Sequence, residues 1–155
     1  MVAKSYSLNF AGYWRSASRD GMPPSSGLFC VYSGSHNAVI GGLALKQLLY
    51  IEEAANLRDS AANHFSWHAW QRYVRYGEEL CFSTALVPAS ERERALAALL
   101  YQHRPVCNDD VPDIFPYDTT TVKTTGTNFG LSPLFTLAQA PFRARRLALY
   151  AGERR

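Results

Sequence analysis

The sequence has few cysteines and no long apolar run, and each of these scarcities excludes a class of protein. The three cysteines, Cys30, Cys81 and Cys107, are odd in number and show no CxxC spacing, which argues against a disulfide framework and a zinc knuckle. No apolar run approaches the roughly 20 residues of a transmembrane helix, and the first residues contain no apolar signal segment. We therefore expect a cytoplasmic protein with reduced thiols and no membrane partner.

Charge is also sparse and nearly balanced. Only 19% of the 155 residues are charged, 47% are apolar, and the formal net charge is +3. This length fits a single domain with its own hydrophobic core, whereas the small positive charge is low for a nucleic-acid-binding protein. Arginines gather near the end, where Arg143, Arg145 and Arg146 are possible phosphate contacts. The alternative for this tail is a solvated amphipathic helix with its arginines on the polar side.

The order of β-rich and helical patterns predicts a small mixed domain. Strands are predicted at 27–34, 47–52 and 78–87. Helices are predicted at 54–63, at 66–77 and from Ser90 to a stop at Pro105. The predicted fold class is α+β, with a small, mainly antiparallel three-stranded central sheet flanked by helices. The single domain, 1–155, would consist of an N-terminal arm (1–26), a motif-bearing core (27–108) and a C-terminal extension (109–155).

The helix that begins near Ser90 has the clearest pattern. Ser90 and Glu93 have the spacing of a capping box. An apolar face follows at helical spacing, formed by Leu96, Leu99, Leu100 and His103. The pattern predicts that Glu93 caps the helix and that Leu96 makes a dry contact with the core.

Four stretches, in this order and at these spacings, resemble the GIY-YIG nuclease family. They are "SGLFCVY" (26–32), "LLYIEEAANLRDSAANH" (48–64), "GEELCFS" (77–83) and "SERERALAALLYQHRPVCN" (90–108). The likeness covers nearly the whole chain and is greatest to the compact bacterial single-domain branch of the family. The resemblance implies a GIY-YIG-like fold, DNA as the usual partner, and phosphodiester cleavage assisted by one divalent metal ion such as Mg²⁺ or Mn²⁺.

The resemblance also implies a set of site positions, several of which are substituted. The positions that keep the family residue are Tyr50, His64 and Asn108. Phe29 stands where the family has a tyrosine that helps to activate the attacking water. Ser60 replaces an arginine that stabilises the phosphoryl charge, and Leu96 replaces the glutamate that binds the metal. Glu52 replaces a glycine of the second motif.

These substitutions disfavour phosphodiester hydrolysis, because that reaction needs cations to offset developing negative charge and a base to deprotonate water. Glu52 adds a negative charge, which makes a metal-free pocket less favourable for phosphate. Arg58 cannot easily replace the lost arginine, because two residues place it about 200° around the helix from Ser60. Glu93, Asp109 and Asp110 are the remaining acidic residues that could restore a metal site.

Tyr50, Glu52 and His64 are the candidate catalytic residues, because a carboxylate can orient a histidine and raise its basicity beside a tyrosine donor. The expected pocket neighbours are Phe29, Ser60, Leu96 and Asn108. The leading hypothesis is metal-free and cofactor-free acid/base chemistry on, or binding of, a small neutral or cationic organic molecule. Two alternatives stay open: a non-catalytic pseudonuclease that binds DNA or protein, and an atypical active endonuclease that requires Mg²⁺ or Mn²⁺. A merely packed, structural His64 is the simplest alternative for that residue.

Overall fold

The computed structural model describes residues 2–37 and 41–139. Arg143, Arg145 and Arg146 lie outside these residues, so their predicted phosphate contacts stay a prediction. The strands are β1 (Lys4–Arg15), β2 (Gly27–Asn37), β3 (Gly42–Ala54), β4 (Glu79–Leu86), β5 (Thr120–Gly126) and β6 (Leu134–Leu137). The helices are the 3₁₀ helix η1 (Ser16–Gly21), α1 (Leu57–Ala62), α2 (Trp67–Gln71) and α3 (Ala89–His103).

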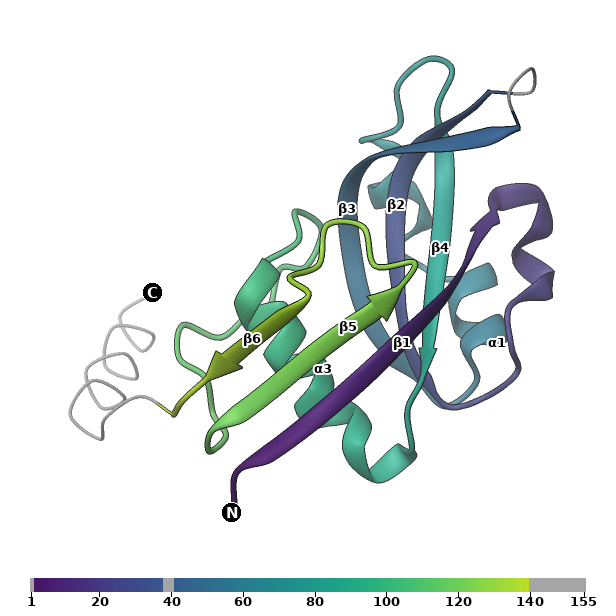
Figure 1. Ribbon diagram of the computed structural model, residues 1–155. Helices are drawn as coiled ribbons and strands as arrows, with labels where there is room; N and C mark the ends of the chain where they lie inside the picture. The colour runs from purple at the N-terminus through teal and green to yellow at the C-terminus, as the bar shows by residue number, and fades with distance from the viewer. Residues whose placement is uncertain (1, 38–40, 140–155) are drawn as a thin grey trace.

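All six strands join one curled sheet in the order β3-β2-β4-β1-β5-β6, which forms half a barrel (Figure 1). Neighbouring strands are antiparallel except for β1 and β5, which are parallel. The three strands expected from the sequence are β2, β3 and β4, with β2 between the other two. The prediction of a three-stranded sheet flanked by helices is nevertheless wrong, because three further strands extend the sheet beyond β4.

The first of these further strands, β1, corresponds to the predicted N-terminal arm. Its alternating residues Leu8 and Phe10 are buried, as expected for one covered face of a strand. The strand pairs with β4 on one side and with β5 on the other, from Lys4 opposite Thr120 to Phe10 opposite Gly126. The predicted arm is therefore an interior strand that joins the expected half of the sheet to the C-terminal strands.

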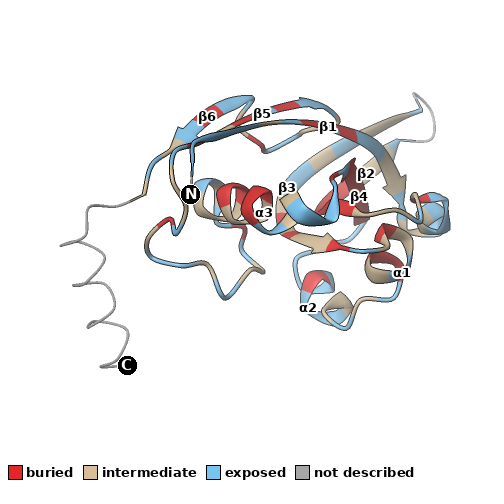
Figure 2. Cartoon of the chain, turned by 90° about the horizontal axis from the view of Figure 1, so that it is seen from below, coloured by how far each residue is buried: buried red, intermediate tan, exposed pale blue. Residues whose placement is uncertain are grey.

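Helix α3 packs against the concave side of the sheet, beneath the arch of β1, β5 and β6 (Figure 2). Its buried residues are Arg94, Ala95, Ala98 and Leu99. The predicted apolar face is therefore rotated: Leu96 is only partly buried, and the small side chains of Ala95 and Ala98 face the sheet. The predicted capping box is wrong, because the helix is capped at Pro88 without a side-chain hydrogen bond.

Helices α1 and α2 cover the opposite face of β2, β3 and β4. A second hydrophobic cluster there includes Phe29, Leu57, Trp70 and Phe82, all of which are fully buried. Helix α2 ends at Gln71 and is shorter than the predicted 66–77 segment. Strands β2 and β4 are thus buried along most of their length, whereas β3 forms the outer edge and is only partly buried.

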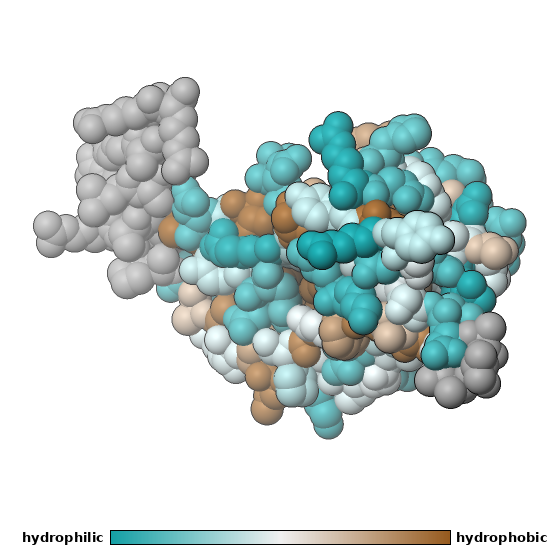
Figure 3. Space-filling view, turned by 90° about the horizontal axis from the view of Figure 1, so that it is seen from above, coloured by the Kyte–Doolittle hydropathy of each residue, from teal (hydrophilic) through white to brown (hydrophobic). Residues whose placement is uncertain are grey.

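Hydrophobic residues on the molecular face seen in Figure 3 form small patches separated by polar residues. Several other large apolar side chains of the described surface are exposed, which is normal for a folded domain. Phe65 differs from the other exposed apolar residues because it lines a cavity, although it is 88% exposed.

Candidate functional site

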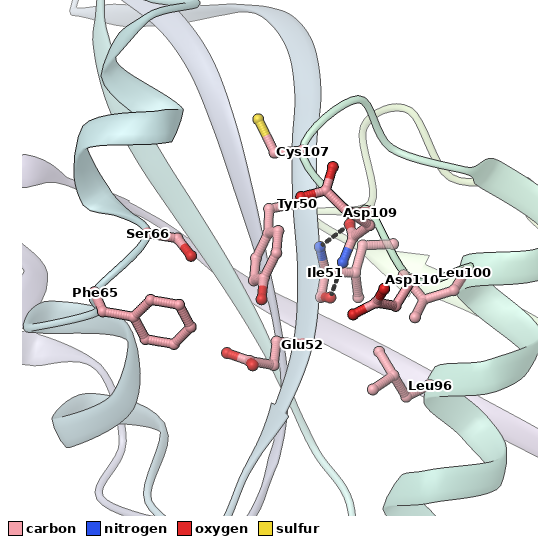
Figure 4. A pocket seen from close by; sticks show the side chains of 11 residues that line it. Tyr50, Ile51, Glu52, Phe65, Ser66, Leu96, Leu100, Cys107, Asp109 and Asp110 are labelled. Carbon is pink, nitrogen blue, oxygen red and sulfur yellow. Dashed lines mark hydrogen bonds between the residues drawn. The ribbon is translucent and has the colours of Figure 1, made fainter. Parts of the chain in front are cut away.

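A cavity of about 280 Å³ lies along the outer edge of β3. Figure 4 shows that β3, the connection between α1 and α2, α3 and the loop after α3 all contribute to it. The lining residues are Tyr50, Ile51, Glu52, Phe65, Ser66, Leu96, Leu100, Cys107, Asn108, Asp109 and Asp110. Strand register explains part of this set, because Tyr50 and Glu52 alternate with Ile51 and so point to the same face of β3.

His64 binds the Glu52 carboxylate at one wall of this cavity. The distance from His64 Nε2 to Glu52 Oε2 is 2.6 Å, and the backbone N–H of Ser66 donates to His64 Nδ1 at 2.9 Å. Since Nδ1 accepts, the proton of a neutral imidazole lies on Nε2 and is donated to Glu52. The ring has no lone pair left for a substrate, so His64 is placed to orient Glu52 rather than to take up a proton itself.

Aromatic packing fixes the His64 ring. Phe65 and Trp70 stack against it with centroid distances of 4.5 and 4.8 Å and interplanar angles of 22° and 27°. Phe29 meets the ring edge-on at 6.1 Å and is completely buried. The His64 side chain is therefore only 5% exposed, whereas that of Glu52 is 31% exposed. The carboxylate, and not the imidazole, is the part of this pair that is open to a ligand.

Tyr50 contacts the same carboxylate. Its hydroxyl is directed toward Glu52 in Figure 4, and its ring centroid lies 5.5 Å from that of His64. Burial, followed by the charge of Glu52 and a hydrogen bond to it, raises the pKa of Tyr50. The phenol therefore remains protonated at neutral pH beside Glu52, and its oxygen lone pairs can act as acceptors.

Asn108 acts on the backbone of β3. Its Oδ1 accepts from the Ile51 N–H at 3.0 Å, and its Nδ2 donates to the Ile51 carbonyl at 2.9 Å. The neighbouring Cys107 N–H donates to the Leu49 carbonyl at 2.9 Å. This segment thus supplies partners to the edge strand, as an adjacent strand would. Asn108 lines the cavity, but both ends of its amide are engaged in holding Ile51.

Asp109, Asp110 and Phe65 also line the cavity but were not among the predicted site residues. Two consecutive acidic residues directly after Asn108 are the sequence signal for the first two, and the sequence indicates them only as substitutes in a metal site. Phe65 directly follows His64, and no pattern in the sequence distinguishes it.

Other predicted positions lie elsewhere. Ser60 is on α1, where its backbone N–H donates to Asn56, and it does not line the cavity. Arg58 donates from Nε to the Met22 carbonyl, at 3.1 Å. Glu93 lies beside Tyr117, whose pKa is raised by burial and by the charge of Glu93. Leu96 lines the cavity from α3, so the dry contact predicted for it is incomplete.

Within residues 2–37 and 41–139, no group of three or more His, Cys, Asp and Glu side chains is arranged to hold a metal ion. The helices of the same residues include none with the length and apolar character needed to cross a membrane. Comparison of the chain with protein-family models, with characterised proteins and with solved structures gave no match.

Proposed function

We propose that this cavity binds a small organic molecule and supports metal-free acid/base chemistry with Glu52 as the proton-accepting group. The observation that carries the proposal is the 2.6 Å contact by which buried His64 fixes a half-open carboxylate at the wall of a cavity. A general base must be held within hydrogen-bond reach of its substrate. Glu52 is held by the His64 donor, and the Tyr50 hydroxyl is directed toward it.

The roles follow from the hydrogen-bond directions. Glu52 takes a proton from the bound molecule, because it is the acceptor that faces the cavity. His64 and Tyr50 are positioning residues: the first acts through Nε2–H and the second through its hydroxyl. Precise orientation of a base accounts for a large part of its catalytic effect. Asn108 supports this arrangement by fixing Ile51, which lies between Tyr50 and Glu52 in the strand.

The charges around the cavity disfavour a phosphate ligand. Its lining contains three acidic residues, Glu52, Asp109 and Asp110, and among the described lining residues none is Lys or Arg. Phosphoryl transfer requires cationic groups aimed at the developing negative charge. This distribution favours the small-molecule hypothesis over cleavage of a nucleic acid at the same place.

A fragment screen by ¹H–¹⁵N NMR on the full chain tests the proposal. We expect cavity-binding fragments to shift the amide signals of residues 50–52, 65–66 and 107–110. Glu52→Gln should weaken those fragments, whereas Glu78→Gln, on the turn before β4, should not. A plasmid-nicking assay with Mg²⁺ or Mn²⁺ tests the alternative that the chain is an endonuclease. Efficient cutting that is abolished by Glu52→Gln, or a screen in which no fragment reaches the cavity, would overturn the proposal.

A further inference from the structure

Hydrogen-bond acceptors dominate the polar wall of the cavity. When ionised, the carboxylates of Glu52, Asp109 and Asp110 can only accept hydrogen bonds, and their formal charge totals −3. The Tyr50 hydroxyl, which is directed toward Glu52, adds further oxygen lone pairs to this wall. A ligand that satisfies this wall must bring donors, and a positive charge makes those hydrogen bonds stronger.

The remaining walls are aromatic and aliphatic. Tyr50 and Phe65 provide ring surfaces, and Leu96 and Leu100 provide the apolar side opposite them. Phe65 is 88% exposed and is held in place by stacking on His64. Aromatic faces attract organic cations, most strongly where water is excluded. The cavity therefore combines negative charge with the surfaces that hold the carbon part of a cation.

The acidic side of the cavity is anchored at the residue before it. The three hydrogen bonds of Asn108, two to Ile51 and one from its own N–H to the Pro105 carbonyl, anchor the start of the loop that bears Asp109 and Asp110. The charge of Asp109 also reaches the interior, because it contributes to the raised pKa values of Tyr50 and Cys107. Glu52 from β3 and the two aspartates from the loop after α3 thus line the same cavity.

We infer that the ligand of this cavity is a small organic cation, a primary ammonium or guanidinium group attached to an apolar chain or ring. The cationic N–H groups bond Glu52 and the loop carboxylates, and the apolar part lies between Phe65 and the two leucines. A cavity of about 280 Å³ limits the ligand to a small one, at the lower end of typical ligand sites. This inference rests on the proposed function, because it names the ligand class for the same cavity.

The test is a ¹H–¹⁵N NMR titration of the full chain at pH 7 with three probes of similar size and different charge. The probes are benzylammonium, benzyl alcohol and benzoate. We expect benzylammonium to shift the amides of Ile51, Glu52, Phe65 and Asp109, and to bind at least about tenfold more tightly than either other probe. The double variant Asp109→Asn/Asp110→Asn should weaken benzylammonium about five- to tenfold. The matched control Asp20→Asn, at an exposed position outside the cavity lining, should leave its affinity unchanged.

The outcomes separate the inference from the proposed function. If benzyl alcohol or benzoate binds the cavity as tightly as benzylammonium, the cation inference fails while the cavity remains a small-molecule site. If Mg²⁺ or Mn²⁺ causes the same shifts and displaces benzylammonium, the acidic groups serve a metal and the inference is overturned. If the double variant keeps the native spectrum and the full affinity for benzylammonium, the loop carboxylates do not recognise the cation and the inference also fails.

Discussion

The side-chain amide of Asn108 pairs with both backbone polar groups of Ile51, at 3.0 and 2.9 Å, across 57 residues of sequence. Ile51 is 1% exposed and lies in an edge strand, where unpaired backbone groups would otherwise be costly. The contact therefore holds together the strand that carries Tyr50 and Glu52 and the loop that carries Asp109.

Replacement of Asn108 by alanine should destabilise the fold and loosen the cavity together. Two hydrogen bonds are lost and the Ile51 groups are left unpaired, which costs about 2–3 kcal/mol. Urea unfolding followed by circular dichroism measures this change. Gln102→Ala provides the control, because its side chain is exposed and makes one long contact of 3.4 Å to Ser132. Equal stability of the two variants would show that the Ile51 contact is dispensable.

Replacement of His64 by phenylalanine should distinguish the role of the His64 ring in aromatic packing from its role in positioning Glu52. Phenylalanine can retain the stacking with Phe65 and Trp70, but it removes the bond to Glu52 and leaves the Ser66 N–H without its acceptor. We expect a stability loss of roughly 1–2 kcal/mol and a marked loss of benzylammonium affinity.

The conservative variant His64→Gln supplies the control, because a glutamine can still donate to Glu52. It should recover part of the benzylammonium affinity without recovering the aromatic stack. If His64→Phe bound the probe as tightly as the native chain, His64 would be a packing residue and not a positioning one.

The part of the fold that could be predicted from the sequence consists of elements with a strong local pattern. Gly27 begins a β-rich run that is indeed β2, and the run from Ala89 to His103 is a helix because its apolar residues recur at helical spacing. The partners of β1 could not be predicted in this way. Leu8 and Phe10 alternate in any strand, and their pairing with β4 and β5 depends on contacts distant in sequence.

In the site, too, local spacing could be predicted from the sequence, whereas contacts that depend on the fold could not. Tyr50 and Glu52 could be placed on one face of a strand by their spacing, and their shared cavity agrees with that. The direction of the His64 hydrogen bonds could not be predicted, because it depends on the Ser66 N–H in a particular turn. Nor could the spacing show that Asn108 binds backbone instead of a ligand.

Arg94 should be among the residues on which stability depends most. It is 7% exposed, and its guanidinium donates to Thr120 Oγ1 and to the carbonyls of Val2, Asp118 and Thr119. These bonds join α3 to the start of β1 and β5. Arg94→Met should lower the free energy of unfolding by on the order of 3 kcal/mol, because several buried carbonyls lose a charged donor. Arg72→Met, at an exposed position, should change it by less than about 0.5 kcal/mol.

His103 should make the fold sensitive to mild acid. Its Nδ1–H donates to the Leu99 carbonyl at 2.9 Å, and its Nε2 accepts from the Ser132 N–H at 2.8 Å. Burial lowers the pKa of His103 below its usual value of 6.5. The unfolded chain therefore binds a proton first, so stability is lost as the pH falls below about 6.5.

The comparison with His103→Leu isolates this effect, since the variant lacks the titrating group. The free energy of unfolding of the native chain should decrease relative to that of the variant between pH 7 and pH 5. A constant difference over this range, measured by urea unfolding at each pH, would show that His103 titrates alike in both states.

The three thiols should differ in reactivity, and Cys107 should report on the cavity. Burial raises the pKa values of Cys30 and Cys81 to about 12, so both should resist a disulfide reagent until the chain unfolds. Cys107 is only partly buried and lines the cavity, although burial and the charge of Asp109 raise its pKa as well. We expect one slow reaction per folded chain, lost in Cys107→Ser.

Benzylammonium should slow the reaction of Cys107 and benzoate should not, because only the cation occupies the space beside Asp109. Equal rates with and without benzylammonium would place the bound probe away from Cys107.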